Sequence, residues 1–151
     1  MLSDVDRRLL RQLQADPTAP ISELADRCGL PAATASRRLE KLARQGVLKG
    51  QSAVIDWQAL GYSVEVSLRF TLDKTQATAF DEFLAAARGI PELIAIQTFL
   101  GVVDVRLSVV ARDMAHYQRL YRNQILTLPH IAELEALMHV ATIKSAESLP
   151  I

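Results

Sequence analysis

Residues 62–72 read Tyr-Ser-Val-Glu-Val-Ser-Leu-Arg-Phe-Thr-Leu, and within this stretch apolar and polar residues alternate without a break. Strict alternation over so many residues is typical of a β-strand that buries one face in a core and leaves the other face open. The stretch therefore predicts a strand over residues 62–72, in a sheet that is packed on one side.

After this strand, segments with the apolar spacing of a helix and segments with the alternation of a strand follow one another along the chain. The predicted elements are a helix with Phe80, Phe83, Leu84 and Ala87 on one face, a hairpin of strands 93–100 and 103–109 turning near Gly101, a helix capped by Asp113, and a last extended segment over 131–143. Their order is β-α-β-β-α-β, which predicts a ferredoxin-like sandwich with helices on one face of an antiparallel sheet.

The chain before this strand has helical spacing of apolar residues instead. A first helix is expected from Ser3, its N-cap, to a stop near Asp16-Pro17, and a short second helix is expected after Ser22. Gly29 suits the end of that helix and Pro31 the start of a third, which runs from about Ala32 to Gln45. Two helices joined by so tight a turn, with a third helix behind them, predict a helix-turn-helix.

The predicted fold class is therefore α+β, with an N-terminal three-helix winged helix-turn-helix followed by the ferredoxin-like βαββαβ sandwich. The expected domains are residues 1–50 and 62–151, joined by a linker strand over 51–61. Half of the 151 residues are apolar, which is enough for a sizeable core.

The formal net charge is zero, but the charges are unevenly distributed. Residues 1–50 hold nine Lys/Arg and six Asp/Glu, and the basic excess lies between Arg37 and Lys49. A basic patch on a helix is weak evidence for polyanion binding, because it is also typical of an ordinary solvated helix face.

The position of the patch within the predicted helix-turn-helix favours DNA. With 100° per residue, Ala35, Leu39 and Leu42 face the core and the cations face outward. Such a helix places its first turn against base edges in the major groove. The expected DNA contacts are Thr34 and Ser36 to bases or phosphate, Arg37 to guanine, and Arg38, Lys41 and Arg44 to phosphates.

Asp104 lies just beyond the predicted hairpin turn at Gly101. A carboxylate in this position is able to bind an amino group, or to fix the turn through backbone amides. The spacing alone leaves both roles open, and the local role is the more common one.

Other chemistry is not indicated. His116, His130 and His139 are scattered and no cysteine lies near them, so we expect no metal site and no cofactor. Cys28, the single cysteine, lies on an apolar stripe and is expected to pack in a core. No nucleophile or phosphate-loop motif is present, so an enzyme is disfavoured. No apolar run is long enough to span a bilayer and no disulfide framework exists, which favours a soluble protein of a reducing cytoplasm.

The motifs, taken in order, resemble the Lrp/AsnC, or feast/famine, family of regulators along essentially the whole chain. The matching segments are residues 2–10, Glu23-Leu24-Ala25, Cys28-Gly29-Leu30, residues 37–42, Gln45-Gly46-Val47-Leu48 and the Gly101-Val102-Val103-Asp104 turn. The resemblance implies a regulator that binds double-stranded DNA, dimerises through its sandwich domains and assembles into tetramers or octamers. It also implies an amino acid or related small-molecule effector at Gly101, Val102, Val103 and Asp104.

Two positions depart from the family pattern. Pro31 stands where the family usually opens the recognition helix with Ser or Thr, so a side-chain N-cap is missing. Val102 and Val103 are both aliphatic where the family often has a polar or aromatic residue, which favours an apolar effector or none. The alternative function is an architectural, DNA-compacting oligomer without an effector.

Overall fold

The computed structural model describes residues 2–145 and 148–151. The chain forms two compact units. Unit 1 comprises the residues up to Val54 and the described part of 144–151, and unit 2 comprises Ile55–Ile143.

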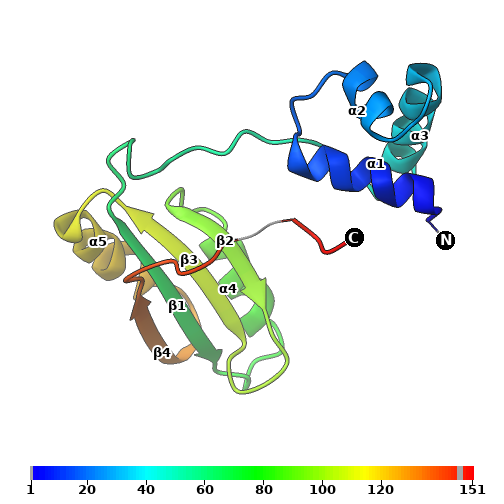
Figure 1. The fold of residues 1–151 in the computed structure, drawn as a ribbon. Helices are drawn as coiled ribbons and strands as arrows, with labels where there is room; N and C mark the ends of the chain where they lie inside the picture. Colours follow the sequence, from blue (N-terminus) through cyan, green and yellow to red (C-terminus); the bar gives the residue numbers. More distant parts are fainter. Residues whose placement is uncertain (1, 146–147) are drawn as a thin grey trace. The chain divides into compact units, whose positions relative to one another are not determined.

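Unit 1 contains three helices, α1 (Asp4–Ala15), α2 (Ile21–Arg27) and α3 (Ala32–Arg44), as Figure 1 shows. Its core joins one or two small or aliphatic side chains from each helix, namely Leu9, Ala25, Cys28 and Ala35. The predicted packing role of Cys28 is confirmed, because only 4% of this residue is exposed.

The helix starts follow the sequence in α1 but not in α2. The Ser3 hydroxyl accepts a hydrogen bond from the Asp6 N–H, and the Asp6 carboxylate accepts one from the Ser3 N–H in return, which forms a capping box. The expected cap at Ser22 is wrong, because Pro20 is the N-cap and α2 begins at Ile21, two residues earlier than a cap at Ser22 would place its start. Pro20 lies in an extended conformation that already directs the chain into the helix without a side-chain bond.

Unit 2 contains a four-stranded sheet with the strand order β2-β3-β1-β4. The elements are β1 (Val64–Leu72), α4 (Ala79–Ala87), β2 (Leu93–Thr98), β3 (Val105–Ala111), α5 (Met114–Leu120), η1 (a π-helical turn, Tyr121–Ile125) and β4 (Ile131–Met138). β1 pairs antiparallel with both β3 and β4, and β2 pairs antiparallel with β3. The predicted βαββαβ order and the α+β fold class are thus confirmed, while the π-helical turn was not foreseen.

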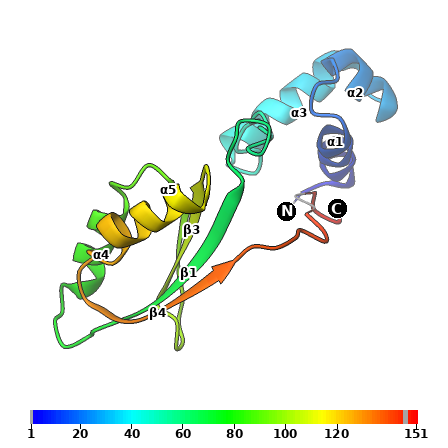
Figure 2. The same cartoon turned by 90° about the vertical axis from the view of Figure 1, so that its left-hand side faces the viewer.

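Both helices lie on the same face of this sheet, as the side view in Figure 2 shows. The core contains the alternate residues of β1 and β3, packed against Phe83 of α4 and Leu120 of α5. The ring centroids of Phe70 and Phe83 are 4.9 Å apart, in an edge-to-face arrangement. The residues between these core positions, such as Arg69, Arg106 and Val110, point to the other face, which no helix of unit 2 covers.

The ends of β1, β2 and β3 differ from the sequence prediction by up to two residues, and three other boundaries differ by more. The linker strand expected over 51–61 is wrong, because residues 51–56 form no strand and residues 57–61 form a turn. The last strand was expected to reach residue 143, but β4 ends at Met138, because its pairing with β1 stops there. The last residues belong to unit 1 instead of the sandwich, since the Gln14 side chain bonds both the N–H and the carbonyl of Leu149, at 2.6 and 3.2 Å.

Candidate nucleic-acid interface and effector turn

The start of α3 is fixed by a short turn. Gly29 has φ +65°, the left-handed conformation expected of a helix C-cap. The Leu30 N–H donates to the Ala25 carbonyl at 2.9 Å, which closes the end of α2. Pro31 is the N-cap of α3 and makes no side-chain bond, as its sequence position predicted. The first N–H groups of α3 therefore have no side-chain cap.

Beyond this turn, α3 separates apolar and cationic residues. Ala35 and Leu42 are buried, whereas Arg37, Lys41 and Arg44 are exposed. Thr34 and Ser36, in the first two turns, are half-buried. We call Thr34, Ser36, Arg37, Lys41 and Arg44 the α3 face.

Local contacts on the α3 face are few. Arg37 Nε donates to the Ala33 carbonyl at 3.3 Å, and the Ser36 hydroxyl donates to Glu40 at 3.3 Å. Within the described part of the chain, none of the three cations of the face forms an ion pair with a carboxylate. These cations are consequently available to an anion from outside.

Arg38, which was expected to contact phosphate, is directed toward α1 instead. Its guanidinium donates to Asp6 Oδ1 at 2.9 Å and to the Ser3 hydroxyl at 3.3 Å. The hydrogen bond from Ser3, followed by the bonds and charge of Arg38, outweighs burial and lowers the pKa of Asp6. Arg38 thus ties α3 to the capping box of α1.

The effector turn predicted in unit 2 is the β2–β3 connection, residues 99–104. It exposes two aliphatic side chains, since Leu100 is fully exposed and Val102 is 82% exposed. Gly101, between them, has φ +152°, a conformation that L side chains rarely adopt. The turn therefore presents backbone and apolar surface at its tip.

Asp104 is buried at the base of this turn and is the only charged residue in the core of the described chain. Its Oδ2 accepts the Leu72 N–H at 2.9 Å, and its Oδ1 lies 2.8 Å from Lys74 Nζ. Its own N–H donates to the Phe70 carbonyl at 2.8 Å. Of the two roles that the sequence left open, these contacts match the local one, in which the carboxylate fixes the turn.

Lys74 is the contact of this turn that sequence reasoning missed. Burial opposes ionisation of Asp104, but the Lys74 hydrogen bond, the Leu72 N–H and the Lys74 charge outweigh it and hold the pKa of Asp104 below its ordinary value. An isolated lysine in a loop between a strand and a helix carries no pattern that would indicate this contact.

A small cavity of about 200 Å³ adjoins the turn on the open face of the sheet. Arg69, Phe99, Val103 and Arg106 line it. Arg106 Cζ lies 5.8 Å from the centre of the Phe99 ring, and Arg106 Nε is buried with no hydrogen-bond partner among the described residues. The cavity thus combines an aromatic wall with two guanidinium groups.

Each histidine lies beside a different carboxylate, His116 near Glu92, His130 near Glu82 and His139 near Glu65.

No helix of the described residues is long and apolar enough to cross a membrane.

Comparison with known proteins identifies both units. Residues 2–49 match a winged helix-turn-helix DNA-binding family, and residues 65–149 match the Lrp/AsnC ligand binding domain. The proline dehydrogenase transcriptional activator of Rhodobacter capsulatus is 30% identical over 132 residues, which cover 87% of this chain and 86% of that protein. The DNA-binding transcriptional activator DecR of Escherichia coli is 29% identical over 154 residues, 100% of this chain and 99% of that one.

Solved structures show the same fold. An AsnC family transcriptional regulator from Agrobacterium tumefaciens superposes with a TM-score of 0.88 at 27% identity, covering 99% of this chain and 97% of that one. A transcriptional regulator of Neisseria meningitidis in complex with L-Met has a TM-score of 0.91 at 23% identity and the same coverage. The matched families and relatives are regulators that bind DNA and not enzymes, and the chain belongs to the Lrp/AsnC family of transcriptional regulators.

Proposed function

We propose that the α3 face contacts DNA and that an apolar amino acid, bound at the 99–104 turn, modulates this binding. The observation that carries the proposal is the set of exposed, unpaired cations of the α3 face, which follows a tight turn in a unit of the helix-turn-helix family. Arg37 is placed to contact a base, and Lys41 and Arg44 to contact phosphates.

Arg38 has no part in this proposal. Its guanidinium already bonds Asp6 and Ser3, so a phosphate contact would break the link between α1 and α3. The uncapped N–H groups behind Pro31 offer a further contact, since the N-terminus of a helix attracts phosphate.

The effector part rests on the chemistry of the turn and its cavity. Leu100 and Val102 suit an apolar side chain, and Arg106 offers a partner to a carboxylate. The structure solved with L-Met belongs to a protein of the same fold, which supports an amino acid as the class of ligand. Asp104 acts here as a positioning residue, because an incoming ammonium group would have to displace Lys74 from it.

We further propose that two copies pair through the open face of the sheet. This face carries Arg69 and Arg106 on the central strands and exposed Glu133 and Glu135 on the edge strand β4. Arg69 and Glu135 already form an ion pair within one copy, at 3.5 Å, so a two-fold axis would bring Arg106 of one copy toward Glu133 of the other. A dimer of this kind would present two α3 faces to two half-sites of DNA, and dimers would associate into tetramers or octamers.

The test combines DNA binding with ligand screening. The full-length protein is titrated onto a duplex found by genome-wide mapping of bound DNA, with and without each of the twenty amino acids, and its melting temperature is measured in parallel. We expect an apolar amino acid to raise the melting temperature, because it binds only the folded protein, and to change the affinity for the duplex.

Two outcomes would contradict the proposal. Failure to bind any duplex would overturn the DNA-binding part. Intact DNA binding without a shift by any amino acid would overturn the effector part and favour the architectural alternative. Analytical ultracentrifugation of the same samples checks the dimer.

A further inference from the structure

Residues 148–151, which we call the tail, belong to unit 1 although they follow the sandwich in the chain. Figure 2 shows the end of the tail, in red, beside α1. The last strand of the sandwich, β4, ends at Met138. Unit 1 is therefore connected to unit 2 twice, once between α3 and β1 and once between β4 and the tail.

The tail is held by the side chains of two residues on α1. The Leu149 N–H donates to Gln14 Oε1 at 2.6 Å, and Gln14 Nε2 donates to the Leu149 carbonyl at 3.2 Å. The Gln14 amide thus pairs with the backbone of Leu149 as a residue of a neighbouring antiparallel strand would. Arg11, three positions away and therefore on the same side of the helix, donates from Nε to the backbone oxygen of Ile151.

The tail has a local shape of its own that suits this contact. The Ile151 N–H donates to the Leu149 carbonyl at 2.9 Å, which closes a three-residue turn around Pro150. The ring of Pro150 fixes φ near the value that such a turn needs. A proline at this position lowers the conformational entropy that the tail loses when it docks.

The docking of the tail is weak enough to be reversible. Leu149 is 66% exposed and Arg11 is exposed, so the contact buries little apolar surface. Hydrogen bonds between exposed groups contribute little net free energy, because water competes for the same partners. The covalent connection compensates for this weakness, since a segment on a short flexible connection has an effective concentration in the millimolar range.

The docked tail leaves the α3 face free. Among the described residues, the hydrogen bonds from the tail to other parts of the chain go to Arg11 and Gln14, and none goes to α3. The tail is nevertheless connected to α3 indirectly, because Asp6 of α1 accepts a bond from Arg38 at 2.9 Å. The tail thus holds the helix to which α3 is bonded, without covering the cations that the proposed function assigns to DNA.

We propose that Arg11 and Gln14 form a docking surface for the tail, and that the docked tail is a second tether that restrains unit 1 relative to the sandwich. The ten residues from Met138 to Ser148 extend over at most roughly 36 Å, which limits the positions open to unit 1. In the dimer of the proposed function, on which this step rests, the restraint limits the distances between the two α3 faces. It thereby selects the spacing of the two half-sites.

Nuclear magnetic resonance relaxation of the Ile151 amide tests the docking. The order parameter of this amide should lie above about 0.6 in the wild type and fall below it in Gln14→Ala and in Leu149→Pro, which removes the N–H that bonds Gln14. Leu149→Ala is the matched control, because it keeps this N–H and changes only an exposed side chain. Arg8→Ala, at another exposed position of α1, should also leave the amide ordered.

The restraint is measured with a variant that lacks residues 148–151. Relaxation of the α1 and α3 amides gives the rotational correlation time of unit 1, and relaxation of the β1 and β3 amides gives that of unit 2. We expect the deletion to shorten the correlation time of unit 1 and to leave that of unit 2 unchanged.

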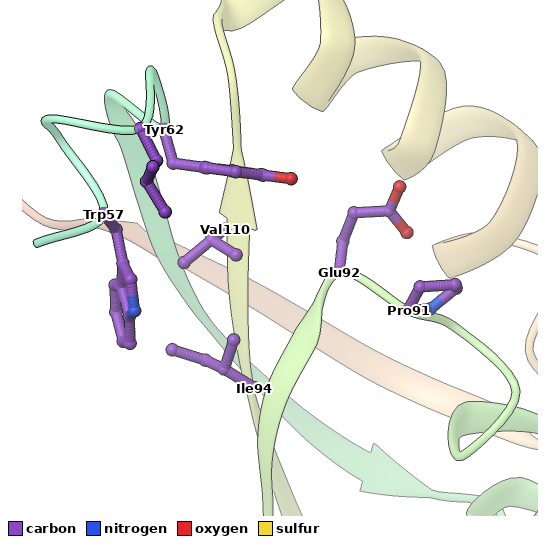
Figure 3. Close-up of a pocket in the computed structure, with 7 residues that line it drawn as sticks. Trp57, Tyr62, Pro91, Glu92, Ile94 and Val110 are labelled. Atoms are coloured by element: carbon purple, nitrogen blue, oxygen red, sulfur yellow. The ribbon is translucent and has the colours of Figure 1, made fainter. Parts of the chain in front are cut away.

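Trp57 reports whether the sandwich is intact in each variant. It is the single tryptophan of the chain and lines a cavity with Ile94 and Val110, as Figure 3 shows. Val110 points to the open face of the sheet, where the proposed dimer forms. Unchanged Trp57 fluorescence and an unchanged mass on ultracentrifugation confirm that a variant differs from the wild type in its tail alone.

The consequence for DNA is measured on duplexes with two half-sites, at the best spacing and at a spacing changed by about five base pairs, half a helical turn. The ratio of the two Kd values should fall by roughly threefold or more in the deletion variant and in Gln14→Ala, because a less restrained unit 1 reaches both spacings. The salt slope should not change, since no phosphate contact is lost.

Two results would overturn the tether. They are an Ile151 amide that is as mobile in the wild type as in Gln14→Ala, and a correlation time of unit 1 that the deletion leaves unchanged. An unchanged ratio of Kd values would overturn the role of the tether in half-site spacing. Failure of the wild type to bind any duplex would overturn the proposed function alone, because both relaxation measurements are made without DNA.

Discussion

The α3 face and the 99–104 turn use their charged groups in opposite ways. On the α3 face, Arg37, Lys41 and Arg44 are exposed and have no carboxylate partner in the described structure. At the turn, the one carboxylate is buried and is bonded by Lys74 and the Leu72 N–H. A charge without an internal partner is free to bind a ligand, whereas a charge already neutralised within the fold acts on the shape of its surroundings. Substitution of a charged residue is therefore expected to change ligand binding on the α3 face and to change stability at the 99–104 turn.

The largest expected effect follows from removing the buried carboxylate. Asp104→Ala leaves the Leu72 N–H without a partner inside the protein and frees the turn from β1. We expect the free energy of unfolding of unit 2 to fall by about 2–3 kcal/mol, the usual cost of a buried group that loses a charged partner. Denaturant unfolding followed by Trp57 fluorescence measures it.

Lys74→Ala is the control for this comparison. The Lys74 side chain is 62% exposed, so its ion pair is screened and its loss should cost no more than about 1 kcal/mol. Equal stabilities of the Asp104→Ala variant and the wild type would refute the structural role of the carboxylate. A loss of stability in Lys74→Ala as large as that in Asp104→Ala would mean that the ion pair, and not the bond to the Leu72 N–H, holds the turn.

The next effect concerns the α3 face. Arg37→Ala should raise the Kd for the mapped duplex by roughly thirtyfold, about 2 kcal/mol, and should relax the preference at one base pair. The unfolding curve should hardly change, since Arg37 bonds only the Ala33 carbonyl of its own helix. Binding to a set of duplexes with single base-pair changes measures the loss of preference. An equal loss of affinity for all of these duplexes would mean that Arg37 contacts a phosphate and not a base.

Within α3, Arg38 has a carboxylate partner in the fold and Lys41 has none, so the two residues are expected to respond differently to substitution. Lys41→Ala should reduce the slope of log K against log salt concentration by about one unit, because one phosphate contact disappears. Arg38→Ala should leave this slope unchanged and lower the stability of unit 1 by about 1 kcal/mol, through loss of the bonds to Asp6 and Ser3. Hydrogen exchange of the α1 amides detects the second effect. A reduced salt slope in Arg38→Ala, together with unchanged stability of unit 1, would mean that Arg38 contacts DNA.

The difference between Arg38 and Lys41 also shows what sequence can predict. Alternation in residues 62–72 and helical spacing elsewhere define the elements, because burial repeats with the period of the backbone. The fold class and the outward position of Arg37, Lys41 and Arg44 follow from these periods. The partners of Arg38 and Asp104 do not, because Asp6 and Lys74 are 32 and 30 residues away and meet them only after tertiary packing. The expected linker strand failed for a similar reason, since Asp56 caps a turn that alternation cannot reveal.

The smallest expected effect is the acid dependence of the Asp104 contribution. Its pKa in the folded protein is lowered, so its contacts contribute fully above the unfolded value near 4 and this contribution is lost as the pH falls through the folded value. Asp104→Asn still offers an oxygen to the Leu72 N–H but cannot ionise, so it should unfold at lower denaturant than the wild type at pH 6 and lose this deficit as the pH falls below about 4. The difference is small because solvent screens the exposed Lys74. Trp57 fluorescence in denaturant at each pH measures it, and a deficit that persists unchanged at pH 3 would mean that the charge of Asp104 contributes nothing and that its hydrogen bonds alone hold the turn.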